Sequence, residues 1–282
     1  MTLKPGLYIV STPIGNLNDI TLRALEVMKK SHIILCEDTR ISQKLLAKHD
    51  IHTRLQVYND HSDADLRETV CNYIEQGFAV SLISDAGTPL VSDPGYKLVR
   101  ELKSREFNID AVSGISAPIA ALTLSGLPSD RFLFAGFLPK TDARRKKIFE
   151  EFASLKATLI FFETAKRLVD SLESAQAFYG NRQACVAREL SKLFQEVKLA
   201  RLDELIQIYR TTPPKGEVVL LVSGEEKLDA ESLLADLTKY LKNCLKEKLS
   251  AKDATEKALA KFGNAYGKKE IYKIANSIKD GR

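Results

Sequence analysis

The sequence predicts an α/β fold of two domains followed by a helical C-terminal region, and three observations support this. The chain has 282 residues, about twice a typical domain length, and its 44% hydrophobic and 28% charged residues are ordinary globular values. Short apolar runs alternate with amphipathic stretches along most of the chain, which is typical of α/β domains. The last fifth of the sequence shows helical periodicity alone.

The first alternating unit ends at a turn-rich segment, Gly126-Leu-Pro-Ser-Asp130. Its alternation predicts a mainly parallel sheet, and a small-residue helix over 116–125 closes the unit. The strands are predicted at 7–11, 32–36, 79–84 and 109–112, and the other helices at 20–30, 42–49, 65–75 and 96–103.

A second alternating unit and a helical tail follow. The strands of the second unit are predicted at 132–137, 158–162, 184–187 and 218–222, and its helices at 143–154, 165–178 and 203–209. The tail contains three predicted helices, at 232–249, from Ser250 to about Gly263-Asn264, and at 268–278, the second opening on a capping-box-like pattern. The predicted domains are therefore 1–126, 127–226 and 227–282.

The net positive charge of the chain comes entirely from the tail. The whole net charge of +5 lies in residues 227–282, which hold 13 Lys or Arg and 8 Asp or Glu. Such an excess fits a solvated helical surface or a contact with a polyanion, and charge alone favours the solvated surface.

Several protein classes are disfavoured. The longest apolar runs are strand-sized, far from the roughly 20 residues of a membrane helix, and the N-terminus shows no signal-peptide pattern. The four cysteines are far apart and match no metal-ligand spacing with the four histidines. We expect a soluble, cytoplasmic protein with reduced, buried cysteines and no structural metal site.

The loops after the strands are the candidate ligand sites. The loop Ser11–Asp19 has one glycine, lacks a Gly-x-Gly pattern, and no phosphate loop occurs elsewhere, so nucleotide hydrolysis and hydride transfer lose support. The segment Ser84–Gly95 packs two acids, two glycines and two prolines into twelve residues. We expect Asp85 to Thr88 to contact a ligand and Asp93 to act as a turn or helix cap.

Three further strand ends carry polar groups. Ser116 fits a ligand contact and a helix N-cap equally well. The charged clusters Glu37-Asp-Thr-Arg40 and Ala187-Arg-Glu-Leu-Ser-Lys192 fit surface ion pairs or an active site.

These motifs closely resemble one family. They are Leu7-Tyr-Ile-Val-Ser-Thr-Pro-Ile-Gly-Asn-Leu-Asn-Asp-Ile20, Glu37-Asp-Thr-Arg40, Ser84 to Tyr96, Gly126-Leu-Pro-Ser-Asp-Arg-Phe132, Gly136-Phe-Leu-Pro139 and Ala187-Arg-Glu-Leu190. The chain resembles the bacterial ribosomal RNA small subunit methyltransferase I family of the tetrapyrrole methylase superfamily from about residue 5 to its end. It departs from the family pattern Pro-Gly-Pro-Ser/Cys-Ala at Ser113-Gly-Ile-Ser-Ala117, which keeps Gly114, Ser116 and Ala117 and loses both prolines.

The resemblance implies an S-adenosylmethionine-dependent enzyme that methylates the ribose 2′-hydroxyl of a cytidine in the decoding region of 16S ribosomal RNA, within the small ribosomal subunit. It also implies two α/β domains of tetrapyrrole-methylase type with the cofactor in the cleft between them, and a homodimer. The implied cofactor contacts are Pro13, Ile14, Gly15, Asp85, Ala86, Gly87, Thr88, Pro89, Gly114, Ser116, Ala117, Phe162 and Val222.

The acceptor site needs a base or a cation that favours the alkoxide of a ribose hydroxyl. The charged residues expected there are Glu37, Asp38, Arg40, Arg188 and Glu189, with His61 a weaker candidate. With the resemblance in view, the basic tail fits an RNA contact better than a solvated surface. Two alternatives remain: a tetrapyrrole methyltransferase acting on a small acidic macrocycle, and an RNA-binding or ribosome-assembly factor that has lost its cofactor.

Overall fold

The computed structural model describes residues 2–59, 64–224, 230–247, 249–262 and 266–279. The chain divides into two compact units, Met1–Glu225 and Glu226–Arg282, and each is considered by itself. No helix within the described ranges is both long and apolar enough to span a membrane.

The first sheet of the larger unit is parallel throughout, in the strand order β3-β2-β4-β1-β5. Its strands are β1 (Gly6–Val10), β2 (Ile33–Cys36), β3 (Leu55–Val57), β4 (Ala79–Ile83) and β5 (Ile109–Val112). Because all five strands run the same way, their carboxyl ends and the loops that follow them meet at one edge of the sheet.

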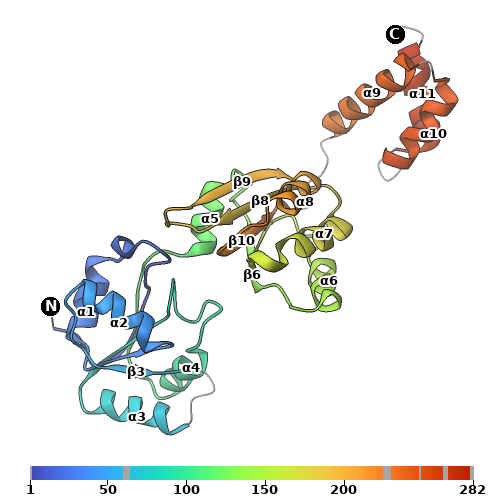
Figure 1. Cartoon of the computed structure of the whole chain (residues 1–282). Coiled ribbons are helices and arrows are strands. Elements are labelled where there is room, and N and C mark those ends of the chain that lie inside the picture. Colours follow the sequence, from blue (N-terminus) through green and yellow to red (C-terminus); the bar gives the residue numbers. More distant parts are fainter. Residues whose placement is uncertain (1, 60–63, 225–229, 248, 263–265, 280–282) are drawn as a thin grey trace. The chain divides into compact units, whose positions relative to one another are not determined.

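Helices cover both faces of this sheet (Figure 1). They are α1 (Leu22–Lys30), α2 (Thr39–Lys48), α3 (Ala64–Glu75) and α4 (Tyr96–Ser104), with a short 3-10 helix η1 (Leu17–Asp19) after β1. The side chains of α1 and α2 pack with one set of alternating strand residues, and those of α3 and α4 with the other. Burial on both faces explains why the central strands are continuous apolar runs.

The second sheet is mixed, in the order β6-β7-β10-β8-β9. Only β6 and β7 pair in parallel, and β10 runs antiparallel to both of its neighbours. Its strands are β6 (Phe132–Phe137), β7 (Thr158–Thr164), β8 (Gln183–Arg188), β9 (Glu196–Arg201) and β10 (Glu217–Val222).

Two layers of helices enclose the second sheet (Figure 1). The helix α5 (Ala117–Ser125) packs on one face, and α6 to α8 pack on the other. The helices of the second layer are α6 (Asp142–Glu151), the 3-10 helix η2 (Ala165–Arg167), α7 (Leu168–Tyr179) and α8 (Leu202–Thr211).

The predicted elements are confirmed with three additions and one correction. The strands β3 and β9 and the short helix η1 were not predicted. The small-residue helix over 116–125 was expected to close the first unit, but α5 packs instead against β7, β8, β9 and β10 of the second sheet. The predicted boundary at residue 126 therefore follows a helix that belongs to the second sheet's core.

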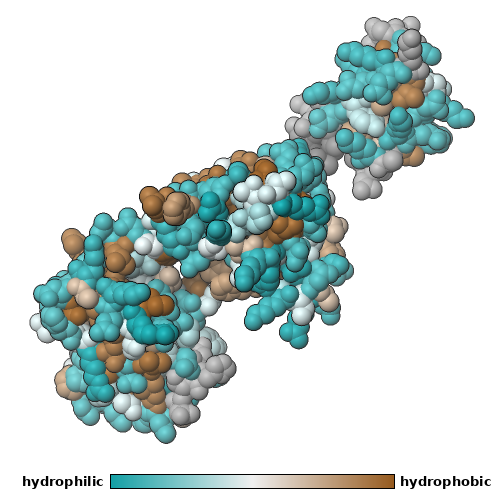
Figure 2. All heavy atoms as spheres, viewed as in Figure 1, coloured by the Kyte–Doolittle hydropathy of each residue, from teal (hydrophilic) through white to brown (hydrophobic). Residues whose placement is uncertain are grey.

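The smaller unit contains the helices α9 (Ala230–Lys246), α10 (Ala251–Phe262) and α11 (Lys268–Lys279) around their own apolar core. Ser250 caps α10, because the backbone N–H of Asp253 donates to the Ser250 Oγ at 3.1 Å, which confirms the predicted cap. The predicted end of this helix at Gly263-Asn264 lies outside the described residues. Hydrophilic residues cover most of the visible face of this unit (Figure 2).

Candidate functional site

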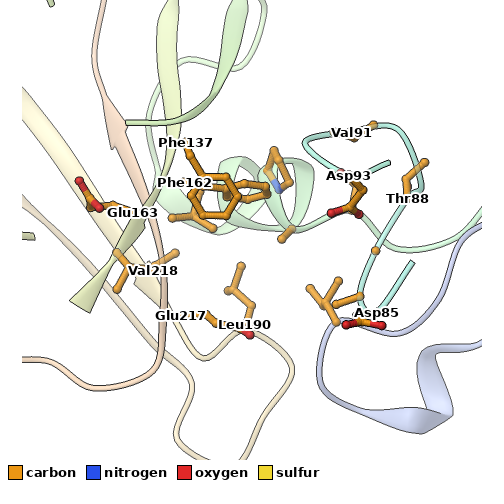
Figure 3. A pocket seen from close by; sticks show the side chains of 18 of the residues that line it. Asp85, Thr88, Val91, Asp93, Phe137, Phe162, Glu163, Leu190, Glu217 and Val218 are labelled. Atoms are coloured by element: carbon orange, nitrogen blue, oxygen red, sulfur yellow. The ribbon is translucent and has the colours of Figure 1, made fainter. Parts of the chain in front are cut away.

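A cavity of about 340 Å³ lies where the loops of the first sheet face the second sheet. One side of it is formed by the carboxyl ends of β1, β2 and β4 and by the start of α5, and the other by the ends of β7 and β8 and the start of β10. Figure 3 shows Asp85 and Asp93 on one side, and Phe137 and Phe162 on the other. The lining residues are Ile14, Glu37, Asp85, Ala86, Gly87, Thr88, Val91, Asp93, Ser116, Ala117, Pro118, Phe137, Phe162, Glu163, Thr164, Ala187, Leu190, Gly216, Glu217, Val218 and Val219.

The loops after β1 and β4 are bound to each other. Thr12 and Gly87 exchange two backbone hydrogen bonds, of 2.8 and 3.1 Å. The hydroxyls of Ser11 and Thr88 lie 3.1 Å apart. These contacts hold the segment Asp85–Thr88 against the end of β1, so its side chains and amides reach the cavity from a fixed backbone.

Three carboxyl groups gather in the cavity wall. Burial, with the nearby charges of Asp93 and Asp85, raises the pKa of Glu37 to about 7. Burial also raises the pKa of Asp93 to about 6, and it raises that of Asp85. The Oε1 atom of Glu37 is buried and has no hydrogen-bond partner among the described residues. An oxygen in that state is ready to accept a proton or a hydrogen bond from a ligand.

Asp38 and Arg40, which follow Glu37 in the motif Glu37-Asp-Thr-Arg40, do not line the cavity. The Asp38 carboxylate caps the start of α2 by accepting from the backbone N–H of Arg40 at 2.8 Å, and it also pairs with the Arg40 guanidinium. The hydrogen bond from Arg40 lowers the pKa of Asp38 to about 2. The Asp38 backbone N–H donates to Asp85 Oδ1 at 3.2 Å, which links the end of β2 to the β4 loop.

The opposite wall is aromatic, and a buried ion pair supports it. The Phe162 ring contacts Phe134 and Phe137, with centroids 4.9 and 5.1 Å away. The adjacent Glu163 has a fully buried side chain that accepts from Ser171 Oγ and pairs with Arg167 at 2.5 Å. This pairing fixes the end of β7 and so fixes the position of Phe162.

Ser116 is the N-cap residue of α5, but its side chain makes no capping hydrogen bond. Its hydroxyl and the first amides of α5 therefore remain available at the cavity wall, where a helix N-terminus favours a negative group. Ser116 therefore occupies the predicted N-cap position without a side-chain cap, and its contact with a ligand stays a prediction.

The residues predicted as cofactor contacts separate into two sets. Eight of the thirteen line the cavity: Ile14, Asp85, Ala86, Gly87, Thr88, Ser116, Ala117 and Phe162. Pro13, Gly15, Pro89, Gly114 and Val222 are not among the lining residues. At Gly15 the reason is close packing, since a Cβ atom there would lie 2.5 Å from Lys192 Cγ.

The predicted cofactor contact of Val222 is wrong. We expected it at a strand end facing the cofactor, but it is fully buried in the core under α6 to α8. Because β10 runs antiparallel to β7 and β8, its first residues, Glu217 to Val219, line the cavity. Val222 lies at the other end of the strand.

Arg188 and Glu189 do not line this cavity. Arg188 pairs with Glu196 of β9, and its side chain lines a second cavity on the opposite face of the sheet from Ala187. Glu189 accepts from Lys192 Nζ and from the backbone N–H of Glu217, both at 3.0 Å. Both residues have strong protein partners, as the alternative interpretation of surface ion pairs predicted.

Sequence reasoning missed several lining residues. Asp93 was expected to be a turn or helix cap, but the N-cap of α4 is Gly95, and the Asp93 carboxyl faces the cavity, where it is bonded to the Ser84 hydroxyl. Its place in the loop Ser84–Gly95 was the available signal. Phe137 lies in the motif Gly136-Phe-Leu-Pro139, to which no ligand contact was assigned. Glu163 and Glu217 carried no motif signal beyond their strand ends. His61 lies outside the described residues.

Among the described residues, one group of side chains has the spacing to share a metal ion. Glu68, Cys71 and Glu101 lie close enough to share a metal ion. Both carboxylates are bonded to Arg105, and Glu101 also pairs with Arg67, so their charge is already neutralised.

Known proteins resemble this chain over nearly its whole length. The family described as Tetrapyrrole (Corrin/Porphyrin) Methylases matches residues 6–206. Ribosomal RNA small subunit methyltransferase I of Rickettsia prowazekii (strain Madrid E) is 58% identical over 279 residues, which is 99% of each chain. The protein of the same name from Mesorhizobium japonicum is 43% identical over 280 residues, 99% of this chain and 94% of that one.

Among solved structures, that of a diphthine synthase superposes with a TM-score of 0.60, covering 78% of this chain and 90% of the other at 19% identity. At this identity the likeness concerns the fold, and it agrees with the two sheets described above.

Proposed function

Because this chain belongs to the tetrapyrrole methylase family, we propose that it transfers a methyl group from S-adenosylmethionine to the 2′-hydroxyl of a cytidine ribose in the decoding region of 16S ribosomal RNA. The names of the relatives support ribosomal RNA as the substrate. The observation that carries the chemistry is the cavity at the carboxyl edge of the first sheet, where one carboxyl oxygen of Glu37, Oε1, is buried without a partner among the described residues.

The cavity residues fit S-adenosylmethionine, which when bound supplies an electrophilic methyl group on a positively charged sulfonium. The carboxyl groups of Asp85 and Asp93 suit a cationic ligand that carries an amino group and ribose hydroxyls. The uncapped start of α5 suits the ligand's carboxylate. Phe162 and its aromatic neighbours offer a face for a purine ring.

We propose Glu37 as the group that accepts the proton of the ribose hydroxyl. A base is most effective when its pKa lies near the working pH, and the pKa of Glu37 is raised to about 7. Asp38 and Arg40 then position the end of β2, since Asp38 caps α2 and its amide binds Asp85. Arg188 and Glu189 shape the wall of the second sheet beside the acceptor.

The RNA also needs a surface that attracts phosphates. The C-terminal unit carries the net positive charge of the chain, and we propose that it contacts ribosomal RNA within the small subunit. We further propose that the enzyme acts in the cytoplasm as a homodimer, as the family resemblance implies.

The test is methyl transfer from labelled S-adenosylmethionine to small ribosomal subunits that lack this modification, followed by mapping of the modified nucleotide. We expect label on the ribose of a decoding-region cytidine, and its loss in Asp85→Ala but not in Asp130→Asn, an exposed loop carboxylate outside the cavity. Binding of S-adenosylmethionine without label transfer would disprove the RNA substrate, and an acidic tetrapyrrole would be the next acceptor to assay. Absence of binding heat in titration calorimetry would disprove the cofactor assignment.

A further inference from the structure

A second cavity, of about 470 Å³, lies beside the first. It is formed by the end of β8, by β9, by the end of α8 and by the loop that leads into β10. Ala187 lines the first cavity and Arg188 the second, because successive residues of a strand point to opposite faces of its sheet. The lining residues are Arg188, Glu189, Phe194, Glu196, Lys198, Ile208, Tyr209, Thr212, Pro213, Pro214, Lys215 and Gly216.

One residue that lines this cavity, Tyr209, has a buried hydroxyl without a partner in the described part of the chain. Tyr209 is 2% exposed, and its hydroxyl has no hydrogen-bond partner among the described residues. A buried phenol normally finds a partner, since an unmade hydrogen bond in the interior is costly. A polar ligand in the cavity would supply that partner.

The charges of the cavity leave a positive excess. Glu196 pairs with both Arg188 and Lys198, and Glu189 is held by Lys192 and by the backbone N–H of Glu217. Lys215 has no carboxylate partner among the described residues. The cavity therefore presents three cations against two carboxylates that are already bonded, which favours an anionic ligand.

Flat apolar groups lie next to these charges. The Phe194 side chain is 68% exposed, although it lines the cavity, and Pro213 and Pro214 form part of the same wall. An exposed aromatic ring beside lysines is the combination on which single-stranded nucleic acid stacks its bases and places its phosphates.

The wall between the two cavities is thin. Gly216 lines both of them. It has a φ of +86°, and a Cβ atom there would lie 2.1 Å from Glu189 Oε1, so a side chain would displace the carboxylate that holds the loop.

We propose that the second cavity binds a nucleotide adjacent to the methylated one in the same RNA strand, with its base against Phe194, its phosphate at Lys215 and a polar group on the Tyr209 hydroxyl. This inference rests on the proposed function, since it assumes that the acceptor in the first cavity belongs to RNA.

The test compares Phe194→Ala, Lys215→Ala and Tyr209→Phe with a control, Lys156→Ala, which removes an exposed loop lysine outside both cavities. With small subunits as substrate, Phe194→Ala should raise KM about tenfold, the loss of one stacked base. Lys215→Ala should raise KM about threefold and make binding less dependent on salt. The values of kcat and the Kd for S-adenosylmethionine should stay within twofold of those of the unaltered protein.

Two further measurements separate a binding role from a structural one. Tyr209→Phe should weaken RNA binding while leaving the melting temperature of the free protein equal or higher, since it removes an unpaired buried hydroxyl. RNA carrying 4-thiouridine next to the target cytidine should crosslink to the peptides that contain Phe194 or Lys215.

Unchanged KM in all three variants, with no crosslink to these peptides, would overturn the proposal while the proposed function stands. Dissociation of a dimer by Phe194→Ala, measured by sedimentation, would also overturn it by showing that the ring is a protein contact. If the unaltered protein methylates no RNA, the proposed function fails instead. Fluorescence anisotropy of a labelled oligocytidine with the same variants would then decide whether the cavity binds nucleotides.

Discussion

The two sheets of the larger unit supply the cavity in different ways. In the parallel first sheet, the carboxyl ends of β1, β2 and β4 all reach one edge and bring Ile14, Glu37 and Asp85 together. In the mixed second sheet, the same cavity meets the ends of β7 and β8 but the beginning of β10. A parallel sheet gathers its loops by geometry alone, whereas in a mixed sheet the direction of each strand decides which residues reach the site.

The comparison also separates two kinds of chemistry. The first sheet contributes carboxyl groups whose pKa values are raised by burial. The second contributes aromatic rings and ion pairs that hold its strand ends in place. We therefore expect substitution of Glu37 on the first side to change the rate of reaction, and substitution of the aromatic side chains on the second to change binding.

The largest expected effect is at Glu37. Glu37→Gln should lower kcat by about a hundredfold or more, because it removes the proposed base while keeping the shape of the side chain. The kcat of the unaltered protein should rise with pH through about 7, as Glu37 loses its proton, and that rise should be absent in the variant. Single-turnover methyl transfer from pH 5.5 to 8.5 measures both, with the exposed Glu75→Gln as control. A variant that keeps the rate and the pH profile would assign the base to another group.

Binding of S-adenosylmethionine should depend on residues at the cavity end of the second-sheet strands and not on residues at their other end. Phe162→Ala should weaken binding of S-adenosylmethionine roughly ten- to a hundredfold, since an aromatic side chain is lost from the cavity wall. Val222→Ala should leave that Kd unchanged and lower the free energy of unfolding by about 2 kcal/mol, because Val222 is fully buried in the core. Titration calorimetry and urea unfolding measure the two quantities. A weaker Kd in Val222→Ala would contradict the direction assigned to β10.

Removing the C-terminal unit should affect RNA and spare the cofactor. A chain ending at residue 224 keeps all residues of both cavities and loses a separate core. Its KM for small subunits should rise about tenfold, with a shallower dependence on salt, while its Kd for S-adenosylmethionine is unchanged. Filter binding at several salt concentrations measures this. An unchanged KM of the shortened chain for small subunits would show that the C-terminal unit does not contact the RNA.

The smallest effect concerns stability and pH. The folded-state pKa of Glu37 lies above its ordinary value of 4.5, so its contribution to stability is fully present below pH 4.5 and is lost as pH rises through 7. Glu37→Gln should therefore melt about 2 °C higher than the unaltered protein at pH 8, and this advantage should shrink toward pH 5. Calorimetric scans at both pH values test this, with Asp130→Asn as the exposed control. An equal difference at both values would show that Glu37 titrates normally.

The parallel sheet was the easier part to predict. Its buried strands are continuous apolar runs, and strand ends in such a sheet predict a shared edge without further information, so Glu37 and Asp85 were found from sequence. Asp93 was missed because an acid before Pro94 is equally typical of a turn, and only the fold shows that it lies in a cavity.

The second sheet was harder for a physical reason. Val222 ends a fully apolar strand, and an apolar run carries no information about its direction, so the wrong end was assigned to the site. The strand β9 alternates charged and apolar residues at the edge of the sheet, as in Glu196 to Lys198, and so short a run did not stand out as a strand. Arg188 was placed in the acceptor site because the motif gives its position along β8 but not the face to which it points.

One apolar cluster joins Ile14, from the loop after β1, with Leu122 of α5 and Ile160 of β7. These side chains are nearly or fully buried, so the first-sheet loop and the second sheet share a single core beneath the cavity. Separating the two sheets by a hinge motion would expose this core to water, which the hydrophobic effect opposes. Ligand exchange must therefore proceed through the solvent-facing mouth of the cavity. Because they share this core, the two sheets should also unfold together in one transition.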